Sequence, residues 1–211
     1  MDTQQDQTLR AQIYLMLSSL FRQVPSTELL SFLANIEVES SASEMQLTWQ
    51  KVKHAADSTD GEALDDEFHA LFIGVGRGEV VPFASWHRTG SLMEKPLAEL
   101  RTDLSMLGFE REENVKEPED HISALCEVMA LLSTEDASHQ QSFFNKHIAP
   151  WFGSLSNQIQ QAENAVFYKA VAELLTAFMA QEQVRFSENT KSSKSTLKID
   201  VKNVTEYEQS E

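Results

Sequence analysis

Apolar residues recur every three or four positions along most of this chain, with polar residues between them. This spacing places the apolar side chains on one face of an α-helix, so it predicts helices that bury this face in a common core. Several of these stretches begin at a capping residue or end near a proline or glycine. They run over residues 9–21, 29–36, 41–56, 60–72, 91–107, 118–132, 139–151 and 155–178.

The pattern shows no strand-like alternation before residue 186 and no internal repeat. A chain of 211 residues is long enough for one sizeable core. We therefore predict an all-α fold, with a single globular domain of about eight to ten helices over residues 1–186. Residues 187–211 carry five apolar residues among 25, which predicts a polar, mobile C-terminal tail. Within it, Leu197, Ile199 and Val201 alternate with charged residues, a strand-like pattern that is too short to form a sheet without a partner.

Two long connectors interrupt the helical pattern, "GVGRGEVVPFASWH" (74–87) and "FEREENVKEPED" (109–120). Connectors of this length are uncommon inside compact domains and tend to be functional. The first contains three of the seven glycines and an aromatic pair, Phe83 and Trp86. The second is acidic and separates two helical halves, so residues 108–118 are a candidate hinge. Exchange of one half between two copies would give a domain-swapped homodimer.

Charge and cysteine content narrow the function classes. Lys and Arg number 17 against 33 Asp and Glu, a net charge of −16. Such a field repels nucleic acids and attracts cationic partners, although acidity also serves solubility alone. The single cysteine, Cys126, excludes an internal disulfide and a cysteine-based zinc site. Because the chain shows neither a run of about 18 apolar residues nor a secretory leader, we expect a cytoplasmic protein without a membrane span.

The segment "KEPEDHISAL" (116–125) holds the densest group of chemical side chains, with Glu117, Glu119, Asp120 and His121 in five positions. A metal site is disfavoured because Pro118 keeps the preceding residue out of a helix, and because the chain lacks the Glu-x-x-His pairs of di-iron bundles. No nucleophile motif accompanies the carboxylates, so we predict neither a catalytic residue nor a metal ligand.

Two interpretations of this segment remain open. Acidic residues in a first helical turn stabilise the helix by accepting backbone N–H bonds and by complementing its dipole. They also provide a surface for binding cations. His121 is predicted to be neutral in that position, with its tautomer fixed by Asp120 or a backbone carbonyl.

The glycine-rich loop Gly74–Gly78 suggests a nucleotide site as an alternative function. Its spacing matches neither G-x-G-x-x-G nor G-x-x-x-x-G-K-[ST], and it follows a predicted helix rather than a strand. A nucleotide-binding switch or hydrolase that uses this loop is kept as the alternative, and a plain acidic scaffold as a third.

Four motifs follow one another in the chain: "YLMLSSLF" (14–21), "EFHALFIGVGRGEVVPFASWH" (67–87), "EPEDHI" (117–122) and "HIAPWF" (147–152). Together they resemble the TorD/DmsD family of all-helical chaperones for molybdoenzymes. The resemblance covers residues 9 to about 182. It departs from the family at residues 74–76, where Gly-Val-Gly stands in place of a common Gly-Pro-Gly.

This resemblance implies a binding protein rather than an enzyme, with no cofactor of its own. Its partner would be the apo-form of a molybdopterin-dependent oxidoreductase, the twin-arginine signal peptide of that enzyme, or both, held until the cofactor is inserted before export. The positions that the resemblance and the aromatic pair suggest for client binding are Leu71, Phe72, Gly74, Gly76, Pro82, Phe83, Ser85, Trp86, Glu117, Asp120 and His121.

The chemistry of the second connector agrees with such a client. Arginine forms bidentate pairs with carboxylates, and residues 110–121 hold six carboxylates. We hypothesise that Asp120 and Glu117 meet the arginines of the peptide and that His121 orients Asp120. The 74–87 loop would then supply an apolar wall.

Overall fold

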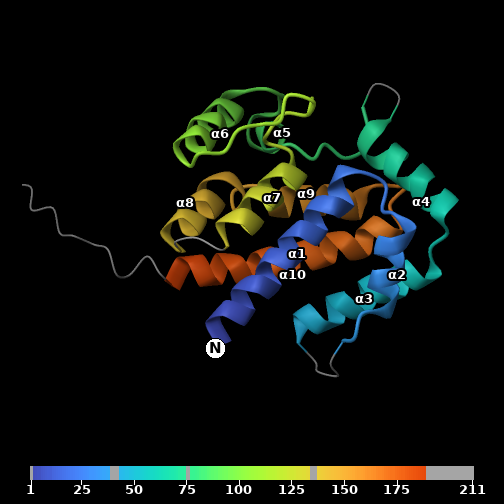
Figure 1. The fold of residues 1–211 in the computed structure, drawn as a ribbon. Helices are drawn as coiled ribbons and strands as arrows, with labels where there is room; N and C mark the ends of the chain where they lie inside the picture. Colours follow the sequence, from blue (N-terminus) through green and yellow to red (C-terminus); the bar gives the residue numbers. More distant parts are fainter. Residues whose placement is uncertain (1, 39–42, 75–76, 134–136, 189–211) are drawn as a thin grey trace, which may run out of the picture.

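The computed structural model describes residues 2–38, 43–74, 77–133 and 137–188, and within these ranges the regular elements are all helical (Figure 1). They are α1 (Asp2–Arg22), α2 (Thr27–Asn35), α3 (Glu44–Ser58), α4 (Gly61–Phe68), the π-helix η1 (His69–Ile73), α5 (Ala84–Thr89), α6 (Lys95–Met106), α7 (Ile122–Leu132), α8 (Ala137–His147), α9 (Phe152–Gln161) and α10 (Phe167–Glu188). The predicted all-α class is confirmed. Gly76 and the tail from residue 189 lie outside the described residues.

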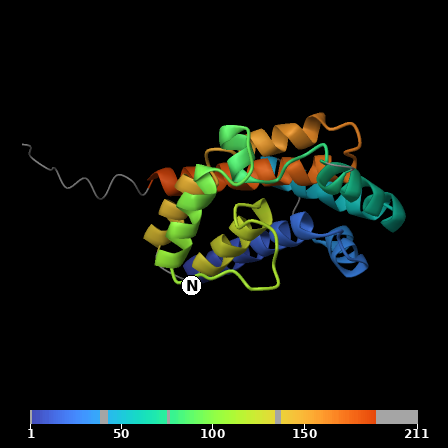
Figure 2. The same ribbon diagram turned by 90° about the horizontal axis from the view of Figure 1, so that it is seen from above.

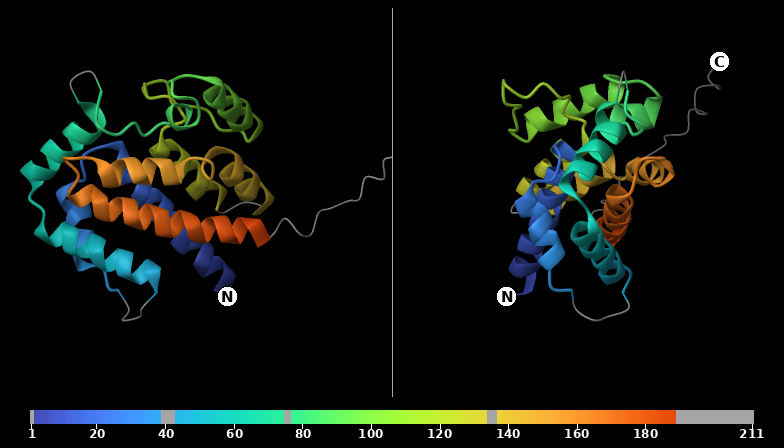
Figure 3. Two further views of the ribbon diagram at one scale, coloured as in Figure 1. Left: turned by 180° about the vertical axis from the view of Figure 1, so that it is seen from behind. Right: turned by 90° about the vertical axis from the view of Figure 1, so that its right-hand side faces the viewer.

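The two longest helices, α1 and α10, run through the middle of the molecule, and the other helices pack around them (Figure 1). α1 packs chiefly against α7, while α10 lies between α3 and α9. The view from behind shows α9 alongside α10, with α3 on its other side (Figure 3). α5 and α6 stand above α7, α8 and α9, and the view from above shows α6 crossing over this layer (Figure 2). Both connectors therefore lie on the same side of the bundle as α5 and α6, at the top of Figure 1.

An aromatic cluster joins three distant parts of the sequence in the core. The ring of Phe72 lies edge-to-face against Tyr168 of α10, with centroids 4.9 Å apart, and against Phe21 of α1, at 5.8 Å. Phe68 of α4 completes the cluster, 5.1 Å from Phe72. Such pairs contribute about 0.5–1.5 kcal/mol each beyond the burial of their area. The cluster holds the end of α1, η1 and the start of α10 together.

A buried polar network fixes α1 against α10. Arg10 Nε donates to Glu182 Oε1 at 2.8 Å, and the Tyr14 hydroxyl donates to Glu182 Oε2 at 3.0 Å. Arg10 also donates to Gln140 of α8 at 3.0 Å. A buried ion pair is tolerated when further hydrogen bonds satisfy its polar atoms, as these do. The network therefore specifies one register between the two longest helices.

Glu67, near the end of α4, caps the first turn of α10 from outside that helix. Its carboxylate accepts the N–H groups of Val166, Phe167 and Tyr168 at 2.7, 3.0 and 2.9 Å. The first N–H groups of a helix lack intrahelical partners, and a negative charge there also complements the helix dipole. The cap ties the α4–η1 segment to the start of α10.

Two boundaries differ from the sequence prediction. Residues 84–89, predicted as part of a loop, form the short helix α5. The helix predicted from residue 118 begins instead at Ile122, with His121 as its N-cap, so Pro118 lies in the connector and not in the first turn. One backbone N–H at this end, that of Ser123, donates to the His121 ring, an acceptor that was not predicted from the sequence.

Candidate functional site

A groove of about 470 Å³ opens between the end of α1, η1, the connector of residues 109–121 and α7. Its floor is apolar, and its rim carries five glutamates against two arginines. The floor side chains Ile73, Val115 and Leu131 are 56%, 39% and 50% exposed. Open apolar surface bordered by charge is typical of an interaction site. The floor contains Phe21, Phe68, Phe72, Ile73, Pro82, Phe83, Leu104, Phe109, Val115, Val128 and Leu131; the rim contains Glu110, Glu112, Glu117, Glu119, Glu127, Arg22 and Arg111.

One part of the floor is built by η1, which continues α4 and ends at Gly74. Gly74 has φ 57°, a conformation that favours glycine. The chain then folds back on the turn, and the Val80 N–H donates to the Leu71 carbonyl at 2.8 Å. A Cβ on Gly78 would lie 2.2 Å from that same carbonyl oxygen, so this close return requires glycine. The π-helical turn is thereby fixed with its last two side chains lining the groove.

One wall of the groove is an isolated antiparallel bridge that pairs Phe83 with His121. The Ala84 N–H donates to the Asp120 carbonyl at 3.0 Å. On the other side of the bridge, the Ile122 N–H donates to the Pro82 carbonyl at 2.9 Å. The Phe83 and His121 rings meet edge-to-face with centroids 4.9 Å apart. The two connectors singled out in the sequence thus form one wall.

Asp120 lies behind this wall and is 1% exposed. Its Oδ2 accepts the backbone N–H of Ser85 at 2.8 Å and the Ser85 hydroxyl at 2.6 Å. Its Oδ1 is buried with no hydrogen-bond partner among the described residues. The carboxylate therefore holds the first turn of α5 against the connector and is not part of the groove lining.

His121 caps α7, and this corrects the hypothesis that it orients Asp120. Its Nδ1 accepts the Ser123 N–H at 3.1 Å and bonds the Ser123 hydroxyl at 2.8 Å. Because Nδ1 accepts an N–H, the proton of the neutral ring is on Nε2. Burial, helped by the positive charge of Arg22, lowers the pKa of His121 to about 4, so the ring is neutral at pH 7.

The rim divides into paired and unpaired carboxylates. Glu119 accepts two hydrogen bonds from Arg101, at 3.0 and 2.8 Å, and Glu127 pairs with Arg22. Partial burial alone would raise the pKa of Glu119, but the Arg101 bonds hold it below its usual value. The remaining rim glutamates are exposed and form no ion pair with any described residue; they are Glu110, Glu112 and Glu117.

The predicted site residues separate into two groups around the groove. Those that line it are Phe72, Pro82, Phe83, Glu117 and His121. Those that support it from behind are Leu71, Gly74, Ser85 and Asp120. Trp86 lies outside the lining, with the Arg77 guanidinium 4.6 Å from its ring centroid. Gly76 lies in the part of the chain that is not described.

The sequence argument missed the α7 side of the groove. Ala124, Val128 and Leu131 line it at i, i+4 and i+7, the spacing of one helical face. This stripe widens the apolar surface of α7 beyond the face that packs in the core. A helix that is apolar over more than one face is a usable signal of a second contact surface.

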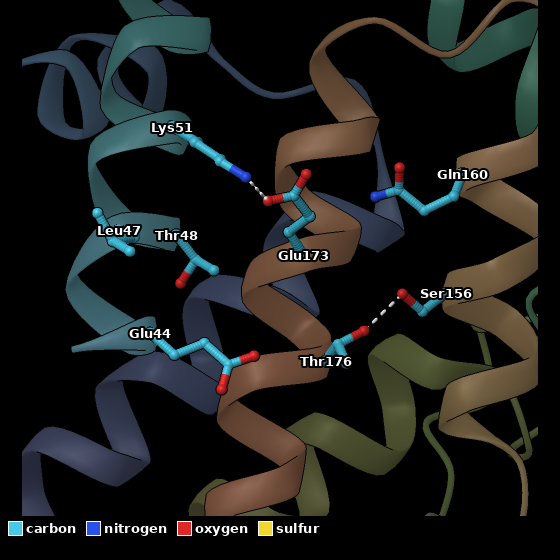
Figure 4. Close-up of a pocket in the computed structure, with 8 residues that line it drawn as sticks. All are labelled: Glu44, Leu47, Thr48, Lys51, Ser156, Gln160, Glu173 and Thr176. Carbon is cyan, nitrogen blue, oxygen red and sulfur yellow. Dashed lines mark hydrogen bonds and ion pairs between the residues drawn. The ribbon is translucent and has the colours of Figure 1, made fainter. Parts of the chain in front are cut away.

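A second cavity of about 280 Å³ lies between α3, α9 and α10 (Figure 4). Its lining is mostly polar, and four of its eight residues pair with one another. Lys51 pairs with Glu173, and Ser156 and Thr176 share a hydrogen bond of 2.6 Å (Figure 4). Because these polar groups are engaged with one another, this cavity is a weaker candidate than the groove.

Backbone bonding weighs against a phosphate site in the glycine loop. A phosphate cradle uses backbone N–H groups that point at the ligand. Here the N–H groups of Gly74, Glu79 and Val80 donate to carbonyls of η1, at 2.7, 3.2 and 2.8 Å. The described residues that flank positions 75 and 76 are thus bonded to the preceding turn.

Among the described residues, no group of three or more His, Cys, Asp or Glu side chains is arranged to hold a metal ion. No helix of the same residues is both long enough and apolar enough to cross a membrane.

The chain is similar to a protein family and to several known chaperones. Residues 16–157 match the model of the family described as nitrate reductase delta subunit. A chaperone protein TorD from Vibrio cholerae is 29% identical over 198 residues, covering 82% of this chain and 90% of the relative. A chaperone protein TorD from Aliivibrio fischeri is 26% identical over 195 residues, covering 81% and 91%.

A solved structure shares the fold. It is a crystal structure from Archaeoglobus fulgidus, described as that of a proposed redox enzyme maturation protein. The TM-score is 0.53 at 23% sequence identity, with 82% of this chain and 93% of that chain covered.

Proposed function

This chain belongs to the nitrate reductase delta subunit family, and from that membership we propose that it is a chaperone for a molybdopterin-dependent oxidoreductase. The family match and the TorD relatives confirm the resemblance noted in the sequence. The chaperone would bind the apo-form of its client, the twin-arginine signal peptide of that client, or both. It would hold the client in the cytoplasm until the cofactor is inserted.

The groove supports this proposal because it combines the two surfaces that such a signal peptide needs. A twin-arginine peptide carries adjacent guanidiniums beside an apolar segment. The exposed Ile73, Val115 and Leu131 offer apolar contact, and the unpaired rim glutamates offer carboxylates for the guanidiniums. Charge-assisted bonds of this kind are roughly twice as strong as neutral ones. This pairing of surfaces in one groove is the observation that carries the proposal.

The groove geometry also supports different tasks for the motif residues. Glu117 faces the groove and would contact an arginine, while Phe72 and Phe83 would contact the apolar segment. Asp120, held by Ser85, would act by positioning the wall rather than by touching the client. These tasks describe binding without turnover, so we propose that the protein is not an enzyme and that it needs no cofactor of its own.

The test is a calorimetric titration of the full chain with a twin-arginine leader peptide and with a twin-lysine control. We expect the arginine peptide to bind more tightly, because its guanidiniums can bond carboxylates bidentately. The double variant Glu112→Gln/Glu117→Gln should weaken binding at least tenfold, since two charge-assisted contacts are lost. Glu44→Gln, in the other cavity, is the matched control and should bind as the wild type does.

If the wild type and the double variant bound the arginine peptide equally well, the groove would not be the binding site. If neither peptide bound, the signal peptide would not be the ligand. Contact with the mature part of the client would then be sought by co-purification with the apo-enzyme.

A further inference from the structure

The chain itself contains a second sequence that combines cationic and apolar residues. Residues 191–204, "KSSKSTLKIDVKNV", hold four lysines and one aspartate, a net charge of +3 in a protein of net charge −16. These residues lie beyond α10, outside the described part of the structure. We propose that this segment binds in the groove of the same molecule and competes there with the client. The competition rests on the proposed function, whereas binding of the segment to the groove does not.

The sequence of the segment matches both surfaces of the groove. In an extended chain, alternate side chains point to opposite sides. One side of the segment then carries Lys194, Lys198 and Lys202 together with Asp200, a net charge of +2, and the other side carries Leu197, Ile199 and Val201. The aliphatic side of such a segment can contact the apolar floor of the groove, and its lysines can contact the carboxylates of the rim.

The groove offers a counterpart for each kind of side chain. Two of its five rim glutamates, Glu119 and Glu127, are already paired with arginines. The other three form no ion pair with any described residue, which leaves three carboxylates for three lysines. The most exposed apolar side chains of the floor, among them Ile73 and Leu131, would be covered by the aliphatic side of the segment.

The length of the segment is suited to the position of the groove. The last turns of α10 are held against α8, where Gln141 Nε2 donates to the Phe186 carbonyl at 2.5 Å. α8 is the next helix after α7, and Leu131, near the end of α7, lines the groove. The end of α10 and α8 lie at one end of the molecule (Figure 1). Leu197 is nine positions beyond Glu188, which is about 30 Å of extended chain, whereas α7 is about 16 Å long.

Tethering makes even a weak contact effective. A segment held at an effective concentration on the order of 1 mM, with an intrinsic Kd on the order of 100 μM, lowers the apparent affinity of a competitor about tenfold. A client whose arginines form bidentate pairs would still displace the lysines. The segment would thus keep the apolar floor covered until a client arrives.

The first test is hydrogen exchange measured on the full chain without any client. In the wild type, we expect amides of residues 191–204 to exchange about tenfold more slowly than in an unfolded peptide. The triple variant Lys194→Gln/Lys198→Gln/Lys202→Gln should lose this protection, and so should Glu112→Gln/Glu117→Gln in the groove. Two matched controls should keep it: Glu44→Gln, and Glu206→Gln/Glu208→Gln beyond the segment.

Three results would overturn the proposal. Exchange of residues 191–204 at the unfolded rate in the wild type would show that the segment is not bound. Protection that survives Glu112→Gln/Glu117→Gln would place it outside the groove. Protection that rises with protein concentration would place the segment in the groove of a second copy.

The second test measures the competition. The triple lysine variant should bind a twin-arginine peptide about tenfold more tightly than the wild type, and the Glu206→Gln/Glu208→Gln control should not. If the lysine variant bound the peptide with the affinity of the wild type, the segment would not compete with the client. If the peptide bound neither protein, the signal peptide would not be the ligand and competition would be measured against the apo-enzyme, while the hydrogen exchange would still decide where the segment lies.

Discussion

Neighbouring residues of the "EPEDH" segment act on different sides of the groove wall. Glu117 is exposed on the rim, Asp120 is buried against Ser85, and His121 caps α7 while its ring meets Phe83. A segment that resembles a single reactive cluster in the sequence is therefore divided between contact and support. Substitutions in it should separate accordingly into effects on affinity and effects on stability.

Ser85→Ala should lower the free energy of unfolding by about 1.5–3 kcal/mol, the usual contribution of a hydrogen bond to a charged group. It removes the hydroxyl that donates to the Asp120 carboxylate, which is already short of one partner on Oδ1. Glu117→Gln should leave stability within about 0.5 kcal/mol, as exposed substitutions usually do, and weaken client binding instead. Urea unfolding checks the first effect and calorimetry the second, with the exposed Ser91→Ala as control. Equal stability of Ser85→Ala and wild type would show that this bond does not hold α5.

The stability of the protein should fall in acid because His121 is buried as the neutral ring. Its folded pKa of about 4 lies below the value of about 6.5 in an unfolded chain. The stability that it contributes is therefore fully present above pH 6.5 and is lost as the pH falls towards 4, by about 3 kcal/mol in all.

His121→Asn isolates this effect, because asparagine caps a helix well and does not titrate. The wild type should lose more stability than the variant between pH 6.5 and 4 in urea unfolding. Carboxylates that titrate in this range are common to both proteins and cancel in the comparison. Parallel pH profiles would mean that the ring is accessible to protons in the folded state.

The identity of these residues was visible in the sequence, but their partners were not. Asp120 and Ser85 are 35 positions apart, so no local spacing connects them. Histidine is not among the usual N-cap residues, so the capping role of His121 on α7 has no recognisable signal in the sequence. The sequence therefore identified the chemically important segment without showing which side chains face the groove.

At the scale of elements, periodicity predicts long helices and fails for short ones. α5 has six residues, fewer than two turns, so no repeat can become visible in its sequence. The π-helical turn η1 follows α4 without a break in the apolar pattern, and its presence depends on the return of the chain at Gly78. Both elements arise from contacts between distant segments, and both shape the groove.

The cap that Glu67 places on α10 should be one of the strongest single contributions among these elements. Glu67→Ala leaves three N–H groups without their acceptor, two of them at the buried Phe167 and Tyr168, which should cost about 2–3 kcal/mol of unfolding free energy. It should also weaken client binding, since α4 continues into the floor of the groove. Glu62→Ala, on the exposed side of the same helix, is the control and should change neither property. A variant as stable as this control would mean that water replaces the carboxylate.

At the scale of the whole molecule, the sequence was sufficient for the fold class but not for the helix pairing. Amphipathic stretches require a common core, whatever their order, and this predicts an all-α domain. Which faces meet depends on interactions such as Arg10 with Glu182, 172 positions apart. The groove lies between elements from both halves of the chain, so its shape could not be read from any one segment.

The pairing of helices across the connector also bears on the predicted domain-swapped homodimer. α1 packs on α7 and α3 packs on α10, so the half before residues 107–121 and the half after them each complete the core of the other. Exchange of the second half between two copies would preserve all of these contacts, including Arg10 with Glu182. The 15 residues of the connector span about 50 Å when extended, enough to pass between copies.

We therefore expect refolding at high protein concentration to yield a dimer that dissociates slowly, because dissociation requires both cores to open. Deletion of residues 112–115 should raise the dimer fraction, since a shorter connector is strained when it turns back within one chain. Analytical ultracentrifugation after refolding at low and high concentration measures both effects. An equal deletion in the loop between α2 and α3 is the control, because it leaves the connector intact. Monomer at every concentration, with or without the deletion in the connector, would mean that the connector closes within one chain more readily than it exchanges.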